Sequence, residues 1–122
     1  MSHKVNINST GEFVGVVQAQ LEAYNARDLN AFMKCYHNDI EIYALSEMEP
    51  VIKGASEMRE KYGEMFRDCP DLHCDLRSRL EFGSFVIDEE FVTGQRKFPE
   101  GTHIGAIYQV VDRTIRTVWF TR

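Results

Sequence analysis

Residues 72–91 read LHCDLRSRLEFGSFVIDEEF, and this stretch decides the fold. Over 72–82 the even positions carry apolar or small side chains, and the odd positions carry charged or polar ones. This period of two predicts a β-strand with one face toward a core. The following Gly83-Ser84 predicts a two-residue turn that places Phe82 opposite Phe85. The stretch is therefore a predicted antiparallel hairpin.

The register of this hairpin assigns a face to each of its charged residues. Two pairs of opposite charge then face each other, Arg79 with Asp88 and Arg77 with Glu90. The same register places Glu89 on the apolar face, opposite Ser78. An unpaired carboxylate that faces a core is costly, so its expected response is a raised pKa. We predict that Glu89 is an acid or base near neutral pH, unless a one-residue slip in register sends it to solvent.

Two more strands are predicted at the end of the chain, paired through a turn at Asp112-Arg113. One face is expected to hold Ile104, Ala106, Tyr108, Val110, Ile115, Thr117 and Trp119. Because the other face is also substantially apolar, we expect helices to cover the first and a second copy of the chain to cover the second. The residues expected in that homodimer contact are Ile107, Val111, Val118 and Phe120.

Three helices are predicted before the hairpin. Ser9-Thr10-Gly11-Glu12 is a capping-box pattern that begins the first of them. Asp28 is expected to cap a second, shorter helix, and the third is expected to begin after Ser56 and to end at Pro70. Short strands are expected at 40–45 and near 51–53. This order of elements predicts an α+β fold.

Size and composition limit the class of protein. The 122 residues suit a single domain, 1–122, and contain no linker or repeat. A net charge of −5 without a basic block argues against binding to nucleic acid. No apolar run is long enough to span a membrane, and the first residues lack a signal-peptide pattern. We therefore expect a cytoplasmic protein that contacts neither nucleic acid nor membrane.

Neither a metal nor a cofactor is predicted. The three cysteines are odd in number and lack Cys-x-x-Cys spacing, which favours reduced, buried thiols. The histidines are scattered over several elements without the spacing of metal ligands, and no nucleotide or phosphate motif is present. The residues in question are Cys35, Cys69 and Cys74, and His37, His73 and His103.

Several stretches resemble a known superfamily over about residues 13–120. They are Tyr24-Asn25-Ala26-Arg27-Asp28-Leu29, Tyr36-His37-Asn38-Asp39-Ile40, Gly54 before the third helix, Ala106-Ile107-Tyr108-Gln109-Val110 and Val118-Trp119-Phe120. They are similar to SnoaL-like, "steroid delta-isomerase-like" bacterial members of the nuclear transport factor 2-like superfamily. The resemblance implies a cone-shaped, curved antiparallel sheet with three N-terminal helices packed on its concave face.

The resemblance does not extend to the active site of ketosteroid isomerase. That enzyme uses an aspartate base, with a tyrosine and a protonated aspartate as oxyanion donors. Matching the two sequences places these three roles at Ala44, Gln20 and Ala106, respectively. An alanine can neither take up a proton nor donate one to an enolate, so we do not expect ketosteroid isomerisation.

The resemblance implies a cavity between helices and sheet, so polar residues on the faces assigned to it are the candidate ligand contacts. They are Gln20, Tyr24, Tyr62, Ser78, Glu89, Tyr108, Thr117 and Trp119. One hypothesis is a cofactor-independent isomerase, cyclase or dehydratase that acts on a small apolar molecule. Glu89 would move the proton, and Tyr108 or Gln20 would donate to the oxyanion. The alternative is a non-catalytic dimeric domain that binds a ligand or a protein.

Overall fold

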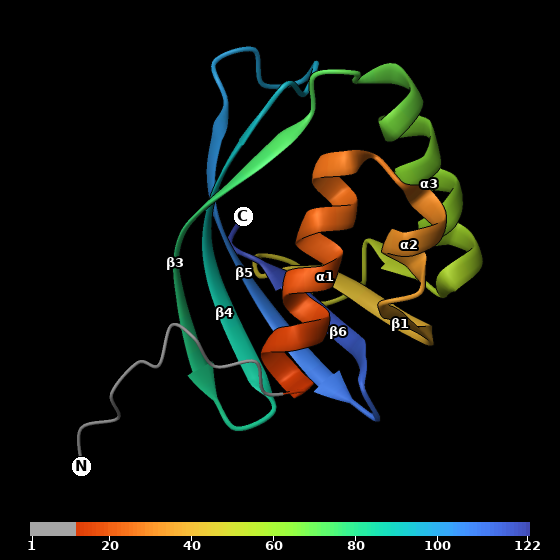
Figure 1. Ribbon diagram of the computed structural model, residues 1–122, viewed down its shortest axis with the longest axis vertical. Coiled ribbons are helices and arrows are strands. Elements are labelled where there is room, and N and C mark those ends of the chain that lie inside the picture. The colour runs from red at the N-terminus through yellow and green to blue at the C-terminus, as the bar shows by residue number, and fades with distance from the viewer. Residues whose placement is uncertain (1–11) are drawn as a thin grey trace.

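The computed structural model describes residues 12–122, and the elements follow the order that the sequence predicts (Figure 1). Ser9 of the predicted capping box lies outside this range. The helices are α1 (Glu12–Ala26), α2 (Leu29–Met33) and α3 (Ala55–Asp68). The strands are β1 (Tyr36–Ala44), β2 (Ile52–Lys53), β3 (His73–Phe82), β4 (Phe85–Thr93), β5 (Thr102–Val111) and β6 (Thr114–Phe120).

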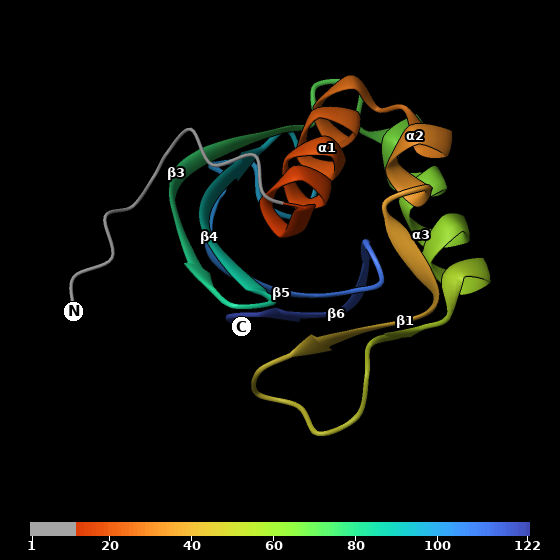
Figure 2. The ribbon, with the colours of Figure 1, turned by 60° about the horizontal axis from the view of Figure 1, so that its bottom comes forward.

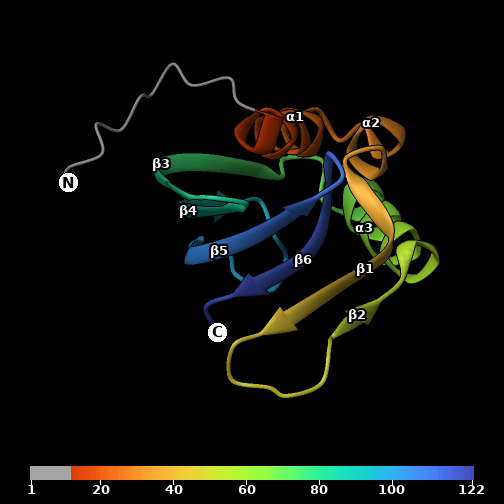
Figure 3. The same cartoon turned by 90° about the horizontal axis from the view of Figure 1, so that it is seen from below.

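The six strands form one curved sheet in the order β2-β1-β6-β5-β4-β3. The sheet bends around α1, and α2 and α3 stand beside the β1 end (Figure 2). Figure 3 shows the same arrangement from below, with the strands fanned out beneath α1 and α2. The α+β class and the helices on the concave face are confirmed.

One strand pair departs from the predicted antiparallel sheet, because β1 and β6 run parallel. The other four neighbouring pairs are antiparallel. The cause lies in the connections: after β2 the chain crosses through α3 to the far edge of the sheet, and the meander from β3 to β6 returns to β1 in the same direction.

The corner between α1 and α2 is hydrogen-bonded to the sheet. The Asn25 side chain donates to the Cys74 carbonyl at 3.0 Å and accepts from the Cys74 N–H at 2.7 Å. It thus satisfies two backbone groups of β3, the edge strand of the sheet that residues 12–122 form. Asp28 caps α2 as predicted, since its carboxylate accepts from the Ala31 N–H at 3.1 Å.

The β3–β4 hairpin keeps the predicted register near its turn. Phe82 lies opposite Phe85, and Ser78 lies opposite Glu89. Further along, Leu76 rather than Arg77 pairs with Glu90. Arg77 is therefore the extra residue of a β-bulge, and the predicted pairing of Arg77 with Glu90 is wrong.

This bulge reverses the two faces of the hairpin relative to the prediction. At the start of β3, Cys74 is buried, but beyond the bulge Leu80 and Phe82 are 46% and 58% exposed. On β4 it is Asp88 and Glu90 that face the core, 0% and 4% exposed. The extra residue shifts the alternation by one, so every side chain between the bulge and the turn changes face.

A second bulge has the same effect on β6. The predicted turn at Asp112-Arg113 forms, and both residues have positive φ, 50° and 67°, as a type I′ turn requires. Gln109 then pairs with Thr117 while Val110 pairs with Ile115, which leaves one extra residue on β6. As a result Val118 and Phe120 turn toward the helices, and Thr117 and Trp119 turn away.

Because of the second bulge, some residues that were predicted on the outer face of the sheet lie on the inner face instead. Val118 is 1% exposed and Phe120 packs against the core, so neither lies on the outer face where both were predicted. Ile107 keeps its predicted outer position, where it pairs with Trp119. The expected homodimer through this face stays a prediction. No helix in the described range has the length and apolar character needed to cross a membrane.

Candidate functional site

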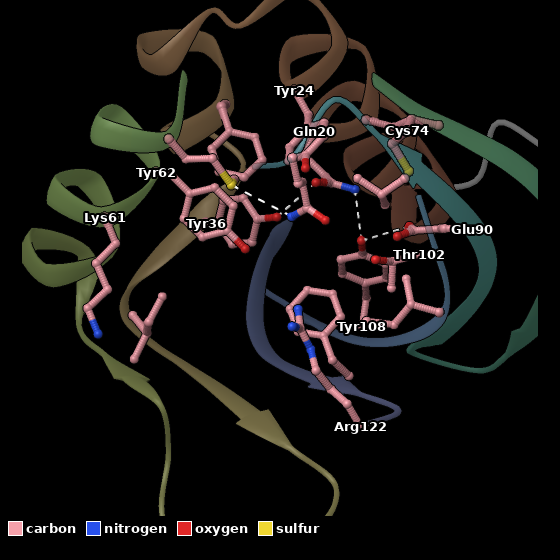
Figure 4. A pocket seen from close by; sticks show the side chains of 18 residues that line it. Gln20, Tyr24, Tyr36, Lys61, Tyr62, Cys74, Glu90, Thr102, Tyr108 and Arg122 are labelled. Atoms are coloured by element: carbon pink, nitrogen blue, oxygen red, sulfur yellow. Dashed lines mark hydrogen bonds between the residues drawn. The ribbon is translucent and has the colours of Figure 1, made fainter. Parts of the chain in front are cut away.

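A cavity of about 230 Å³ lies between the three helices and the concave face of the sheet (Figure 4). The polar side chains that line it come from six elements and from the segments after β4 and β6. They are Gln20, Tyr24, Tyr36, Lys61, Tyr62, Cys74, Glu90, Gln95, Thr102, Tyr108 and Arg122. Apolar side chains, among them Phe32 and Ile104, line the rest. This mixture of apolar walls and a few polar groups is typical of a site for a small organic molecule.

Four buried side chains form a directed chain of hydrogen bonds along the wall. The Tyr36 hydroxyl donates to Gln20 Oε1 at 2.8 Å, and Gln20 Nε2 donates to the Tyr108 hydroxyl oxygen at 3.2 Å. The Tyr108 hydroxyl in turn donates to Glu90 Oε2 at 3.2 Å. Because the Tyr108 oxygen accepts from Gln20, the Tyr108 hydroxyl donates its own proton to Glu90.

Glu90 is the acid of this site. Burial raises the pKa of its carboxyl to about 7, the buried charge of Asp88 adds to the rise, and hydrogen bonds from Tyr108 and Cys74 oppose it. A carboxyl with a pKa near 7 is present in both protonation states at neutral pH. It can therefore accept and return a proton, as general acid–base catalysis requires.

Asp88 lies on the same face of β4 but has a different partner. The Arg79 guanidinium binds both of its carboxylate oxygens, at 2.7 and 2.9 Å, and also donates to Gln18 Oε1 at 2.9 Å. Asp88 is fully buried and does not line the cavity. This ion pair is structural, and it leaves the Asp88 charge close enough to raise the pKa of Glu90.

Burial also keeps the Tyr108 hydroxyl and the Cys74 thiol protonated. It raises the pKa of Tyr108 well above its ordinary value, so this hydroxyl keeps its proton and acts as a donor. Burial likewise raises the pKa of Cys74, and the nearby Glu90 charge adds to this. A thiol that stays protonated is a weak nucleophile, so Cys74 is a neighbour of Glu90 rather than a reacting group. The predicted burial of Cys35, Cys69 and Cys74 is confirmed.

Thr102 carries a polar atom that the described part of the chain leaves without a partner. Its hydroxyl oxygen is buried, and no other described residue hydrogen-bonds to it. Thr102 lines the cavity, and in Figure 4 it lies beside Tyr108 and Glu90. Buried polar atoms normally have a partner, so this hydroxyl is an exception within the cavity wall.

Four of the eight predicted contact residues line the cavity: Gln20, Tyr24, Tyr62 and Tyr108. The other four lie on the opposite face of the sheet, because the two β-bulges reverse their strands. These are Ser78, Glu89, Thr117 and Trp119. Trp119 stacks on Tyr43 there, with ring centroids 6.2 Å apart.

Glu89 does not have the environment that the sequence predicted for it. Its carboxylate is exposed on the outer face, where it accepts from Ser78 Oγ at 2.8 Å and contacts His103 Nε2 at 2.7 Å. These hydrogen bonds lower its pKa, the one to His103 most, where a raised pKa was expected. The predicted placement is wrong, and Glu90, the next residue, has the environment expected of Glu89.

Sequence reasoning missed several residues of the site, above all Glu90, Tyr36, Thr102 and Arg122. Glu90 was expected on the outer face because the bulge at Arg77 was not foreseen. One signal was available: three acids in a row, 88–90, must place at least one carboxylate on each face of a strand. Tyr36 was not among the predicted contacts; it is the first residue of β1 and lines the cavity.

Comparisons with known proteins address both fold and family. A family model described as "SnoaL-like domain" matches residues 17–118. The sequence matches no curated protein. An uncharacterised cystatin-fold protein from Novosphingobium aromaticivorans is 21% identical, with a TM-score of 0.81 over 90% of this chain and 97% of the other.

Two further solved structures carry names that suggest an activity. A candidate polyketide cyclase from Sinorhizobium meliloti is 12% identical, with a TM-score of 0.75 over 88% of this chain and 94% of the other. A candidate ketosteroid isomerase from Kribbella flavida is 16% identical, with a TM-score of 0.73 over 90% of this chain and 76% of the other. At these identities the likeness shows the fold alone.

Proposed function

The chain belongs to the SnoaL-like domain family, and from this premise we propose that it is a cofactor-independent acid/base enzyme for a small ketone. The observation that carries the proposal is Glu90, a buried carboxyl with a pKa of about 7 in the wall of the cavity. Solved structures with this fold include a candidate polyketide cyclase and a candidate ketosteroid isomerase. Proton transfer next to a carbonyl is chemistry that such a site can perform.

In the proposed reaction the Glu90 carboxylate removes a proton from the carbon next to the ketone carbonyl. The C–H bond breaks, an O–H bond forms on Glu90, and the electron pair moves onto the ketone oxygen. The Tyr108 hydroxyl turns from Glu90 to donate to this oxygen, while Gln20 keeps its hydrogen bond to the Tyr108 oxygen. Glu90 then returns the proton, so the cycle needs no cofactor.

The site differs from that of ketosteroid isomerase in where the acid and the donor come from. The base position of that enzyme corresponds to Ala44, and its second aspartate corresponds to Ala106. Ala106 is buried and pairs with Asp88 rather than with Glu90. Glu90 on β4 and Tyr108 on β5 therefore form a different pair, and steroid isomerisation is not the proposed reaction.

The first test is exchange of the methyl protons of acetophenone in D₂O, followed by ¹H NMR. We expect the wild-type protein to accelerate exchange and Glu90→Gln to lose at least about 100-fold of that acceleration, the usual contribution of a general base. The glutamine side chain keeps the shape of the carboxyl and an acceptor for Tyr108, so the fold is preserved.

The matched control is Glu89→Gln, which removes the neighbouring carboxylate from the outer face. This variant should exchange acetophenone at the wild-type rate. If Glu90→Gln retained full acceleration, or if Glu89→Gln lost it, Glu90 would not be the base. If wild type accelerated no exchange, the proton transfer itself would be refuted.

The second candidate function is binding without turnover. It is favoured by the hydrogen bonds that already link Tyr36, Gln20, Tyr108 and Glu90 to one another. In such a protein, wild type and Glu90→Gln would bind acetophenone in the cavity equally well, and both would leave its methyl protons unchanged. Binding and exchange measured on the same samples separate the two functions.

A further inference from the structure

The cavity wall has an uneven distribution of charge. Glu90 is the single acid among the described residues that line it, and two cations, Lys61 and Arg122, line it as well. Figure 4 shows these three side chains at different sides of the cavity, with Tyr108 between Glu90 and Arg122. A ligand that fills the space therefore meets a proton-transfer group in one region and a positive charge in another.

Arg122 is held in place by its backbone and by a ring that also lines the cavity. Its N–H donates to the Phe120 carbonyl at 2.9 Å, and its carbonyl accepts from the Ser46 N–H at 3.1 Å. The guanidinium carbon lies 5.4 Å from the centroid of the Phe120 ring. These contacts direct the guanidinium to the cavity although the residue follows the last strand.

Arg122 is exposed, but it lines the cavity and its charge acts on Tyr62, another residue of the wall. Burial raises the pKa of the Tyr62 hydroxyl to about 12, and the positive charge of Arg122 opposes this rise. A positive group that stabilises a negative oxygen on Tyr62 would equally stabilise a negative group of a ligand at that place.

The two cations differ in whether their charge is already compensated. Lys61 Nζ lies 3.1 Å from Glu57 Oε2 and donates to the Val51 carbonyl at 3.3 Å. Arg122, by contrast, forms no ion pair with any residue from 12 to 122. Since a guanidinium matches the two oxygens of a carboxylate, Arg122 offers the better position for an anion.

We propose that the natural substrate is a small, single-ring ketone that carries a carboxylate, with the ketone at Tyr108 and Glu90 and the carboxylate at Arg122. The inference rests on the proposed function and specifies its substrate class. The cavity of about 230 Å³ is smaller than the roughly 300–1,000 Å³ of pockets for drug-sized ligands, which favours a single ring.

The test compares acetophenone with 4-acetylbenzoate, which has the same ketone and one added carboxylate. Dissociation constants are measured by titration for wild type, Arg122→Gln and Arg67→Gln. We expect wild type to bind 4-acetylbenzoate about ten-fold more tightly than acetophenone, because a charge-assisted hydrogen bond is added. Arg122→Gln should abolish this preference.

Arg67→Gln is the control, since it removes the same charge from an exposed position of α3 outside the cavity. It should keep the ten-fold preference. Equal affinity of wild type for both compounds, or a preference that survives in Arg122→Gln, would overturn the inference. The inference would also be overturned if wild type bound neither compound.

The outcomes also separate this inference from the proposed function. If both compounds bind equally and exchange of acetophenone still depends on Glu90, the substrate class is refuted and the proton transfer stands. If 4-acetylbenzoate binds through Arg122 but neither compound exchanges, the anion site is supported and the proton transfer is refuted.

Discussion

Glu90 and Asp88 lie two positions apart on the same face of β4, and the difference between their partners explains the chemistry of the site. Asp88 meets the guanidinium of Arg79 at 2.7 Å, so its buried charge is compensated. Within residues 12–122, Glu90 hydrogen-bonds to the neutral hydroxyl of Tyr108 and the neutral thiol of Cys74. Neutral donors offset less of the cost of burying a charge than a cation does, and the pKa of Glu90 is therefore raised.

This raised pKa makes the stability of the protein depend on pH. Below pH 4.5, the ordinary pKa of the carboxyl, Glu90 is protonated in both the folded and the unfolded state. Between 4.5 and about 7 the unfolded state releases the proton first, so the free energy of unfolding falls as the pH rises. A shift from 4.5 to about 7 corresponds to a loss of roughly 3 kcal/mol at most.

Glu90→Gln should remove this loss. Urea unfolding of wild type and variant at pH 4.5 and pH 8 measures it: relative to wild type, the variant should gain up to about 3 kcal/mol at the higher pH. Glu89→Gln provides the control, because the pKa of Glu89 is lowered rather than raised and the variant should show no such gain. A stability difference between wild type and Glu90→Gln that stays constant with pH would contradict the assignment.

Two β-bulges decide which side chains of the sheet enter the cavity. The sequence predicts both hairpin turns, the register near them and the pairing of Arg79 with Asp88, all of which are confirmed. It does not predict the bulges, because their extra residues, Arg77 and Arg116, carry no signal that distinguishes them from ordinary strand residues. A single extra residue moves every later side chain to the other face, so half of the predicted contact residues were misplaced.

Two glycines at strand ends have positive φ but different surroundings. At Gly94, after β4, φ is 83° and an added Cβ would press against the Asp71 carbonyl and the Leu72 N–H. At Gly83, in the β3–β4 turn, φ is 58° and an added Cβ meets nothing within 4 Å. A side chain at Gly94 is therefore disfavoured both by the positive φ and by a steric clash, whereas a side chain at Gly83 is disfavoured by the positive φ alone.

Alanine substitutions should separate the effect of the positive φ from that of the steric clash. Gly83→Ala should cost about 1–2 kcal/mol of unfolding free energy, the penalty of a left-handed conformation. Gly94→Ala should cost about 2–5 kcal/mol, since overpacking against the backbone of Asp71 and Leu72, just before β3, adds to this penalty. Thermal or urea unfolding of both variants measures the difference. Equal losses of unfolding free energy for the two variants would contradict the close contact between Gly94 and the backbone of Asp71 and Leu72.

At the scale of the whole molecule, the cavity is formed by segments that lie far apart in the sequence. Gln20 on α1 and Tyr108 on β5 are joined by one hydrogen bond, and Tyr36 on β1 extends the chain of hydrogen bonds. The fold could be predicted because helical stripes, strand alternation and motifs around residues 24–29 are local signals. The site could only partly be predicted, because the closure of a curved sheet around α1 is not local.

The central claim is that Glu90 is a buried acid/base group in this cavity, and a titration of its carboxyl tests it most directly. The ¹³C resonances of the glutamate carboxyls are followed from pH 3 to pH 9 in labelled wild-type protein, and Glu90→Gln identifies the Glu90 resonance by its loss. We expect this resonance to titrate near pH 7. Titration at the ordinary value near 4.5 would contradict the claim.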